Sequence, residues 1–431
     1  MRRSVGICLC LVLGLTTAAC NCNEELFADG GLRDGRQEGS AEVGIPNTCP
    51  AGTKLPSITG VVYAPNGTDP IDRALVYVAR GDVPPLPPGN ECDLCKILSS
   101  GVWVQTHSGP EGRFTFDQVP VGQQKVVIQL GRFRRIVSVD AACGQTIALT
   151  AEQSRMPRDK SEGDVPRLAV ATGPVDKIQD VVTKIGLKEF DLYEGRGPSS
   201  TTSYPKLDTL LTDPVKLGGY HIVMLNCSDG FHDLVQSGPA VKNLQDFVNV
   251  GGRLFIDDLS YEFVEWPFPK AIDFEPDPAS AKLGQETPQE PLDDAQMGKP
   301  VAAVNGTIVQ PELKAWMANF PGTMNADGTV KIEGWLSHWA VMHAAAPGTK
   351  VWVEGNVEYY QSTSGSPAGS GVRPLSASVD PLGPNAKRCG RVAFNSYHTV
   401  PNNSSPTGPF LPQERILEYI FFRVADCLTL E

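Results

Sequence analysis

The stretches YHIVMLNC (residues 220–227) and RLFIDD (residues 253–258) decide the fold of this chain, together with the segment between them. Each is a short apolar run of the kind that forms a buried strand. Between them, Pro239 opens a segment with apolar residues at helical spacing, and Gly251 ends it. A strand, a helix and a second strand in this order form a right-handed unit with parallel strands. We therefore expect Cys227, Asp257 and Asp258 to lie at one carboxyl edge of a sheet, where open α/β sheets bind ligands.

The length and charge of the chain limit the classes of protein that it can be. With 431 residues, 41% of them hydrophobic and 20% charged, it has the composition of a globular protein of two or three domains. Its formal net charge is −12, which argues against nucleic acids and anionic membrane surfaces as partners. We expect no nucleic acid among its ligands.

The first twenty residues have the pattern of an export signal. Arg2 and Arg3 precede an apolar run over residues 5–15, and small residues lead to Cys20. This pattern predicts a signal peptide over residues 1–19. The run LTTAAC (residues 15–20) resembles the lipobox of bacterial lipoproteins, which implies a lipidated Cys20 and a membrane anchor through it. Because Asn21 is not the aspartate that marks inner-membrane retention, we expect an outer-membrane lipoprotein of the cell envelope, periplasmic or surface-exposed.

Residues 20–54 are polar and lack apolar periodicity, so we expect a flexible tether. Short strands separated by turn residues follow, and they predict an all-β sandwich over residues 55–152. The fragments ITGVV (58–62), ALVYV (74–78), GRFTF (112–116) and VPVG (119–122) resemble the carboxypeptidase regulatory-like, or transthyretin-like, domain. The resemblance implies a rigid module without catalytic function.

The cysteines beyond Cys20 are eight, an even number, which favours disulfides in an exported protein. Cys92 and Cys95 lie in a loop inserted into the sandwich and could staple it, although their spacing also fits half of a metal site. Cys49 and Cys143 flank the sandwich and could tie its ends together. We predict a further bridge between Cys389 and Cys427, because the last helix returns toward the start of the last strand. We expect no metal and no cofactor.

A polar linker is expected at residues 153–164, followed by a second domain over residues 165–431. Strands and helices alternate there, which predicts an α/β domain with a doubly wound, mainly parallel sheet. Residues 311–320 and 335–345 are expected to be short helices, and residues 412–425 a closing helix. The segment 265–310 is rich in proline and acidic residues, so we expect an insertion that forms a lid or a surface excursion. The fold class is thus multidomain, with an N-terminal all-β sandwich and a C-terminal α/β domain.

Three stretches of this second domain resemble the class I glutamine amidotransferase-like fold, and most closely its ThuA-type branch. They are YHIVMLNC (220–227), NVGGRLFIDD (249–258) and GRVAFNSYHT (390–399). In active members the nucleophilic cysteine follows the strand that matches residues 253–256, where this chain has Asp257 and Asp258. The family's histidine matches His398, but the His-Pro-Glu pattern is replaced by His-Thr-Val. Glutaminase chemistry is therefore not expected.

Other roles for these residues stay open. Cys227 could act as a nucleophile with His398 as its base, if the thiol and the imidazole touch. The carboxylates, with Glu262 and His398, could hold a cation or form an acid/base pair. Alternatively, Asp258 caps a turn and His398 is a loop residue without chemistry. The residues proposed to bind a ligand are Cys227, Asp229, Asp257, Asp258, Tyr261 and His398.

The sequence thus favours an envelope lipoprotein that binds a ligand and does not catalyse a reaction. Its ligand would be a saccharide or an envelope protein, held at the carboxyl edge of the sheet. The alternative is a secreted hydrolase that acts on glycans or amides through the same pocket, using Cys227 or Asp258 together with His398.

Overall fold

The computed structural model describes residues 44–91, 100–196, 204–228, 230–274, 295–336, 338–360, 368–379, 390–399 and 406–426. All of these residues belong to one compact unit. This unit is rich in strands, which form several separate sheets, as expected of a multidomain, β-rich protein. Among the described helices, none has both the length and the apolar character needed to cross a membrane.

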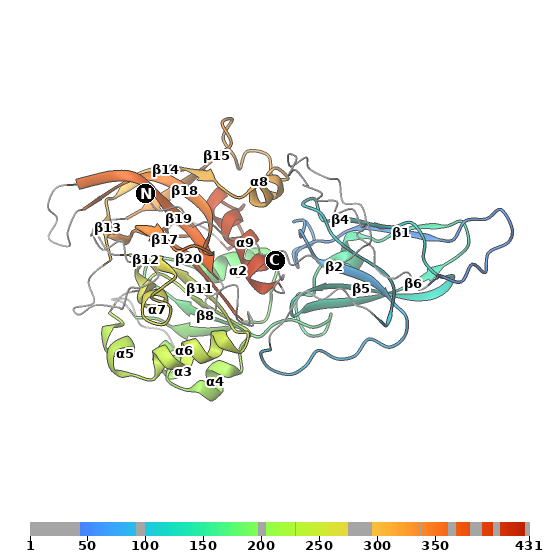
Figure 1. The fold of residues 1–431 in the computed structure, drawn as a ribbon, viewed down its shortest axis with the longest axis horizontal. Coiled ribbons are helices and arrows are strands. Elements are labelled where there is room, and N and C mark those ends of the chain that lie inside the picture. Colours follow the sequence, from blue (N-terminus) through green and yellow to red (C-terminus); the bar gives the residue numbers. More distant parts are fainter. Residues whose placement is uncertain are drawn as a thin grey trace, which may run out of the picture. The chain divides into compact units, whose positions relative to one another are not determined.

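Residues 57–148 form two β-sheets around a common core (Figure 1). One is four-stranded and antiparallel in the order β3-β2-β5-β6, and the other is three-stranded in the order β4-β1-β7. Side chains alternate along each strand; in β4, for example, Phe114 and Phe116 are buried while Arg113 and Thr115 are exposed. The strands are β1 (Ser57–Val61), β2 (Leu75–Ala79), β3 (Val102–His107), β4 (Arg113–Phe116), β5 (Gly122–Leu130), β6 (Phe133–Ala141) and β7 (Thr146–Ala148).

A disulfide joins Cys49 to Cys143, with the two Cα atoms 5.6 Å apart. Cys49 precedes β1, and Cys143 lies in the turn before β7, which pairs in parallel with β1. The bridge that the sequence allowed between the ends of the sandwich is therefore present. Several residues with an expected role lie outside the described residues: Cys20, Cys92, Cys95, Asp229, Cys389 and Cys427.

The rest of the described chain is organised by an eleven-stranded mixed sheet. One half is parallel, in the order β9-β8-β10-β11-β20, and the other half continues antiparallel through β19, β18, β14 and β15. The strands of the first half are β8 (Leu168–Thr172), β9 (Asp191–Glu194), β10 (Ile222–Leu225), β11 (Arg253–Asp257) and β20 (Arg391–Asn395). Those of the second are β13 (Met297–Gly298), β14 (Val301–Ile308), β15 (Thr329–Trp335), β16 (Trp339–Ala340), β18 (Lys350–Tyr360) and β19 (Ala368–Val379).

The strand, helix and strand expected over residues 220–258 are present as β10, α6 (Ala240–Asn249) and β11. The two strands are parallel and in register from Ile222 with Arg253 to Leu225 with Ile256. Leu244, Phe247 and Val248 of α6 are buried, at the spacing that the sequence predicted. A further helix, α5 (His232–Ser237), precedes α6 and was not anticipated.

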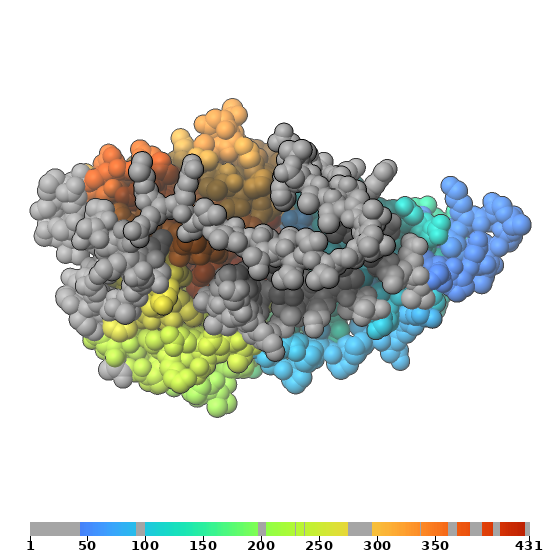
Figure 2. Space-filling view, in the orientation of Figure 1, coloured from blue at the N-terminus to red at the C-terminus, as the bar shows by residue number. Residues whose placement is uncertain are grey.

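Helices cover both faces of the parallel half. Ile222 and Met224 of β10 belong to one core with α2 and α9, whereas Val223 and Leu225 belong to a second core with α3, α4 and α6. In Figure 2 the yellow-green residues of the second helical layer form the surface at the lower left. The other helices are α1 (Ala151–Ser154), α2 (Ile178–Ile185), α3 (Leu207–Leu211), α4 (Pro214–Gly218), η1 (Asp258–Ser260), α7 (Glu262–Glu265), α8 (Pro311–Met317) and α9 (Pro412–Ala425).

The prediction of a helix at residues 335–345 is wrong. The described part of this segment contains the end of β15, β16 and the short strand β17 (Ala344–Ala345). β16 pairs with β13, and β17 pairs with β12 (Ile272–Asp273), which is more than seventy residues away in sequence. Trp335 and Trp339 are both buried, with ring centroids 4.5 Å apart. The four-residue spacing of these tryptophans is also typical of one face of a helix. Pairing with distant strands, however, decides the structure.

Of the segment 265–310, expected to form a lid or a surface excursion, the structure describes residues 265–274 and 295–310. β14 lies inside the mixed sheet between β15 and β18. Phe268, Ile272 and Phe274 are buried in the same core as residues of α7 and β11. Because the segment contains many prolines and acidic residues, its sequence shows no apolar pattern that would indicate these buried positions.

Candidate functional site

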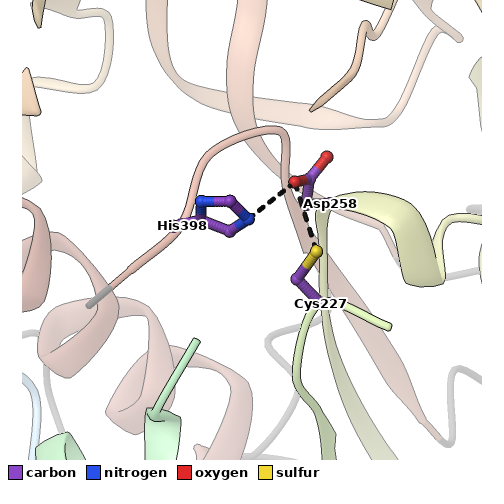
Figure 3. Close-up of side chains that lie close together, drawn as sticks. All are labelled: Cys227, Asp258 and His398. Carbon is purple, nitrogen blue, oxygen red and sulfur yellow. Dashed lines mark hydrogen bonds and ion pairs between the residues drawn. The ribbon is translucent and has the colours of Figure 1, made fainter. Parts of the chain in front are cut away.

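Three side chains meet where neighbouring parallel strands end. Cys227 follows β10, Asp258 comes directly after β11, and His398 lies in the loop after β20. Because β10, β11 and β20 are adjacent and parallel, their carboxyl ends lie together. The sequence-based expectation that these three residues share one edge agrees with their positions in Figure 3.

The Asp258 carboxylate lies between the other two side chains (Figure 3). The Cys227 thiol donates a hydrogen bond to Oδ2 of Asp258 over 3.3 Å, and Nε2 of His398 lies 3.0 Å from the same oxygen. All three residues are buried, with exposed fractions of 1% for Cys227, 1% for Asp258 and 4% for His398. The acid, and not the histidine, is thus the immediate partner of the thiol.

Asp258 has a left-handed backbone conformation, with φ of 48°. Aspartate adopts this region more readily than most residues, but the conformation still costs free energy unless the surroundings hold it. Here Oδ1 of Asp258 accepts a hydrogen bond of 2.8 Å from the backbone amide of Ala340, in β16. The expectation that Asp258 bonds a backbone amide is met, but the amide comes from a distant strand and not from the residue's own turn.

The protonation states follow from burial and from the Asp258 charge. Burial alone would lower the pKa of His398, but contact with the Asp258 carboxylate outweighs it and raises that pKa to about 9. Burial raises the pKa of the Cys227 thiol well above its usual value, and the Asp258 charge raises it further. At neutral pH the site therefore contains an imidazolium and an undissociated thiol, and a buried thiol of this kind is a poor nucleophile.

Asp257 faces a different set of partners from Asp258. Its Oδ2 accepts a 2.7 Å hydrogen bond from the Thr399 hydroxyl. The backbone amide of Thr399 also donates a hydrogen bond of 3.0 Å to Oδ2 of Asp176. Burial raises the pKa of Asp257 well above its usual range, and the charge of Asp176 and a hydrogen bond to it add to this effect. The raised pKa favours the protonated form of Asp257, which belongs to a structural pair with Asp176.

Replacing this acid with its neutral isostere, Asp257→Asn, is expected to preserve or raise stability at neutral and alkaline pH. A carboxyl with a raised pKa contributes stability at pH values below the ordinary aspartate pKa, and this stability is lost as the pH rises through the folded-state pKa. The side-chain amide of the variant can accept the hydrogen bond from Thr399 and donate one to Asp176, and it does not titrate. Urea unfolding across a pH series measures the effect.

The matched control is Asp257→Ala, which removes the acceptor of Thr399 and should destabilise the protein at every pH. A free energy of unfolding for Asp257→Asn that falls further below wild type as the pH rises would contradict a raised pKa of Asp257.

Not all expected site residues lie in this cluster. Tyr261 is buried, and its ring packs against Phe274, with centroids 5.3 Å apart. Glu262 lies 2.7 Å from His232. Asp229 is outside the described residues. Tyr261 thus contributes to packing beside the site.

Sequence reasoning missed Asp176, Asn226 and Thr399. Asn226 accepts the backbone amide of Ile178 over 2.8 Å and so satisfies a free amide at the start of α2. Gly173 lets the loop before α2 approach β10, because a Cβ there would lie 2.3 Å from the Cys227 carbonyl oxygen. The signal for Asp176 was present, since it follows a buried strand of the same parallel set.

Comparisons with known proteins add little to this site. No protein-family profile and no curated protein matches the sequence. Among solved structures, the chain is similar to the structure of PurLQS from Thermotoga maritima, at 9% sequence identity and a TM-score of 0.31. This likeness covers 60% of the present chain and 99% of that one. It is too weak to assign a fold or an activity.

Proposed function

We propose that this chain is a cell-envelope lipoprotein whose second domain, of amidotransferase-like, doubly wound α/β type, has a binding or structural role and no glutaminase activity. The transthyretin-like sandwich would serve as the spacer between the lipid anchor at Cys20 and this domain. The ligand would be a saccharide or an envelope protein that contacts the carboxyl edge of the sheet.

One observation carries the non-catalytic part of this proposal. Asp258 occupies the left-handed turn after β11, the place of the nucleophilic cysteine in the resembled family. Among the described residues, Cys227 is the only thiol in the site; it donates a hydrogen bond to this carboxylate and is 99% buried. A nucleophile must contact its base and be open to substrate, and Cys227 meets neither condition. In this proposal Cys227, Asp258 and His398 hold the loops that shape the edge, and the ligand contacts the rim.

Cys227 is therefore expected to react with iodoacetamide at neutral pH at least about 100-fold more slowly in the folded protein than in the unfolded chain. Peptide mapping by mass spectrometry, before and after unfolding, measures both rates within one preparation. Ammonia release from glutamine should not exceed that of the Cys227→Ser variant. Rapid alkylation of native Cys227, or glutaminase activity that Cys227→Ser abolishes, would overturn the proposal.

The anchor is tested separately by metabolic labelling with palmitate in a bacterial host. We expect label in the wild-type protein and none in Cys20→Ser, with both proteins exported. Equal labelling of the two would refute lipidation at Cys20, while leaving the conclusions about the α/β domain untouched.

A second candidate function rests on the same strained turn. Left-handed Asp258 with His398 at 3.0 Å brings together the two side chains that a hydrolase with an aspartate nucleophile and a histidine base would use, once the histidine has lost its proton. Turnover of aryl glycosides or aryl amides by wild type, lost in both Asp258→Asn and His398→Gln, would favour this alternative. The burial of all three side chains places it second.

A further inference from the structure

Cys227, Asp258 and His398 offer three different ligand atoms to one point. The Sγ, carboxylate and imidazole nitrogen atoms all lie within 4.8 Å of one another. They come from the ends of three adjacent strands and are directed toward each other (Figure 3). A thiolate, a carboxylate and an imidazole form a ligand set typical of zinc and disfavoured by magnesium or calcium, which prefer oxygen ligands.

The orientation of His398 suits a ligand shared between the side chains. Nε2 is shielded from solvent and lies 3.0 Å from Oδ2 of Asp258, with which it forms an ion pair that is not aligned as a hydrogen bond. The same nitrogen, once deprotonated, could direct its lone pair to a metal.

The surrounding contacts are those that orient metal ligands. Nδ1 of His398 faces the carbonyl oxygen of Gly334 at 3.3 Å, which fixes the ring and directs Nε2 toward Asp258 and Cys227. Oδ1 of Asp258 is held by the Ala340 amide, so Oδ2 is the oxygen presented to the site. Each of these two ligands thus has an outer partner that restricts it to one orientation.

We propose that Cys227, Asp258 and His398 bind one Zn²⁺ ion through Sγ, Oδ2 and Nε2. Binding replaces the thiol proton and any proton on Nε2, and the resulting thiolate and carboxylate charges balance the ion. Tetrahedral zinc with Zn–S of about 2.3 Å and Zn–N and Zn–O of about 2.1 Å sets ligand atoms about 3.5 Å apart. The present distances of 3.3 and 3.0 Å, and the wider separation of up to 4.8 Å, reach this geometry by side-chain shifts of about 1 Å. The fourth coordination position of the zinc ion remains for water or an external ligand.

The test uses the untagged full-length chain, made metal-free by dialysis against a chelator and then titrated with Zn²⁺ or Co²⁺. We expect one equivalent of zinc per chain. The cobalt form should show a thiolate-to-cobalt charge-transfer band and the strong visible bands of a tetrahedral site. Cys227→Ser, Asp258→Asn and His398→Gln should each weaken zinc binding at least about 100-fold, and Cys227→Ser should abolish the charge-transfer band. The matched control is His232→Gln, which changes a half-exposed histidine outside the cluster and should bind zinc as wild type does.

X-ray absorption of the zinc-loaded wild type gives a readout that needs no variant, and its first shell should contain one sulfur. Absence of stoichiometric binding, a first shell without sulfur, or a charge-transfer band that survives in Cys227→Ser would overturn the proposal. This inference is independent of the lipoprotein assignment. Alkylation of Cys227 in chelator-treated protein tests the proposed function without zinc, so the two proposals can be judged separately.

Discussion

Removal of the Cys49–Cys143 disulfide is expected to lower the free energy of unfolding of the β-sandwich by about 3–5 kcal/mol. The bridge spans 94 residues and closes nearly the whole sandwich into one loop. Cross-linking so long a loop restricts the unfolded chain strongly, which is the main source of the effect. The bridge also holds β1 beside β7, its parallel partner, which is only three residues long.

Denaturant unfolding of the double variant Cys49→Ser/Cys143→Ser, compared with wild type, measures this loss. Reduced wild type should match the double variant, and a reductant should leave the double variant unchanged. Oxidised and reduced wild type that unfold at the same denaturant concentration would show that the bridge does not constrain the sandwich.

The second large effect concerns the ion pair between Lys184 of α2 and Glu414 of α9. Nζ of Lys184 lies 2.7 and 2.8 Å from the two carboxylate oxygens, and the side chains are 3% and 0% exposed. Lys184→Met leaves the Glu414 carboxylate buried without its cation, which should cost about 3–5 kcal/mol. Because burial already raises the pKa of Glu414, the variant should lose more stability as the pH rises, when the acid must ionise.

The double variant Lys184→Met/Glu414→Gln is the matched control. The Gln side chain can still accept the Leu411 amide, as Glu414 does over 2.7 Å at the start of α9. Removing both charges should recover most of the lost stability, since no buried charge remains. If the single and double variants were equally unstable, packing and not charge would explain the loss.

The sequence predicted best where local pattern and topology agree. The apolar runs of β10 and β11, with an amphipathic helix between them, are confirmed as a parallel strand pair. From that pairing alone, Cys227 and Asp258 were expected at one edge, and the last buried strand added His398. Strand order at the centre of the sheet thus determined most of the candidate site.

The sequence failed where distant pairing decides the structure. Nothing in the local pattern around Trp339 indicates that it pairs with Gly298, and β14 is hidden within a proline-rich segment. The opposite roles of Asp257 and Asp258 also depend on backbone geometry. Adjacent residues with the same side chain differ because the chain turns left-handed at Asp258 and brings it to His398, while Asp257 remains in the strand.

The place of β20 in the mixed sheet has a consequence for synthesis of the chain. β20 is the strand that joins the parallel half, through β11, to the antiparallel half, through β19. Residues 391–395 leave the ribosome after all the other strands of this sheet. Until then, β11 and β19 each present an open edge, and such edges pair readily with other chains. Insertion of β20 pairs both of these edges and so completes the sheet.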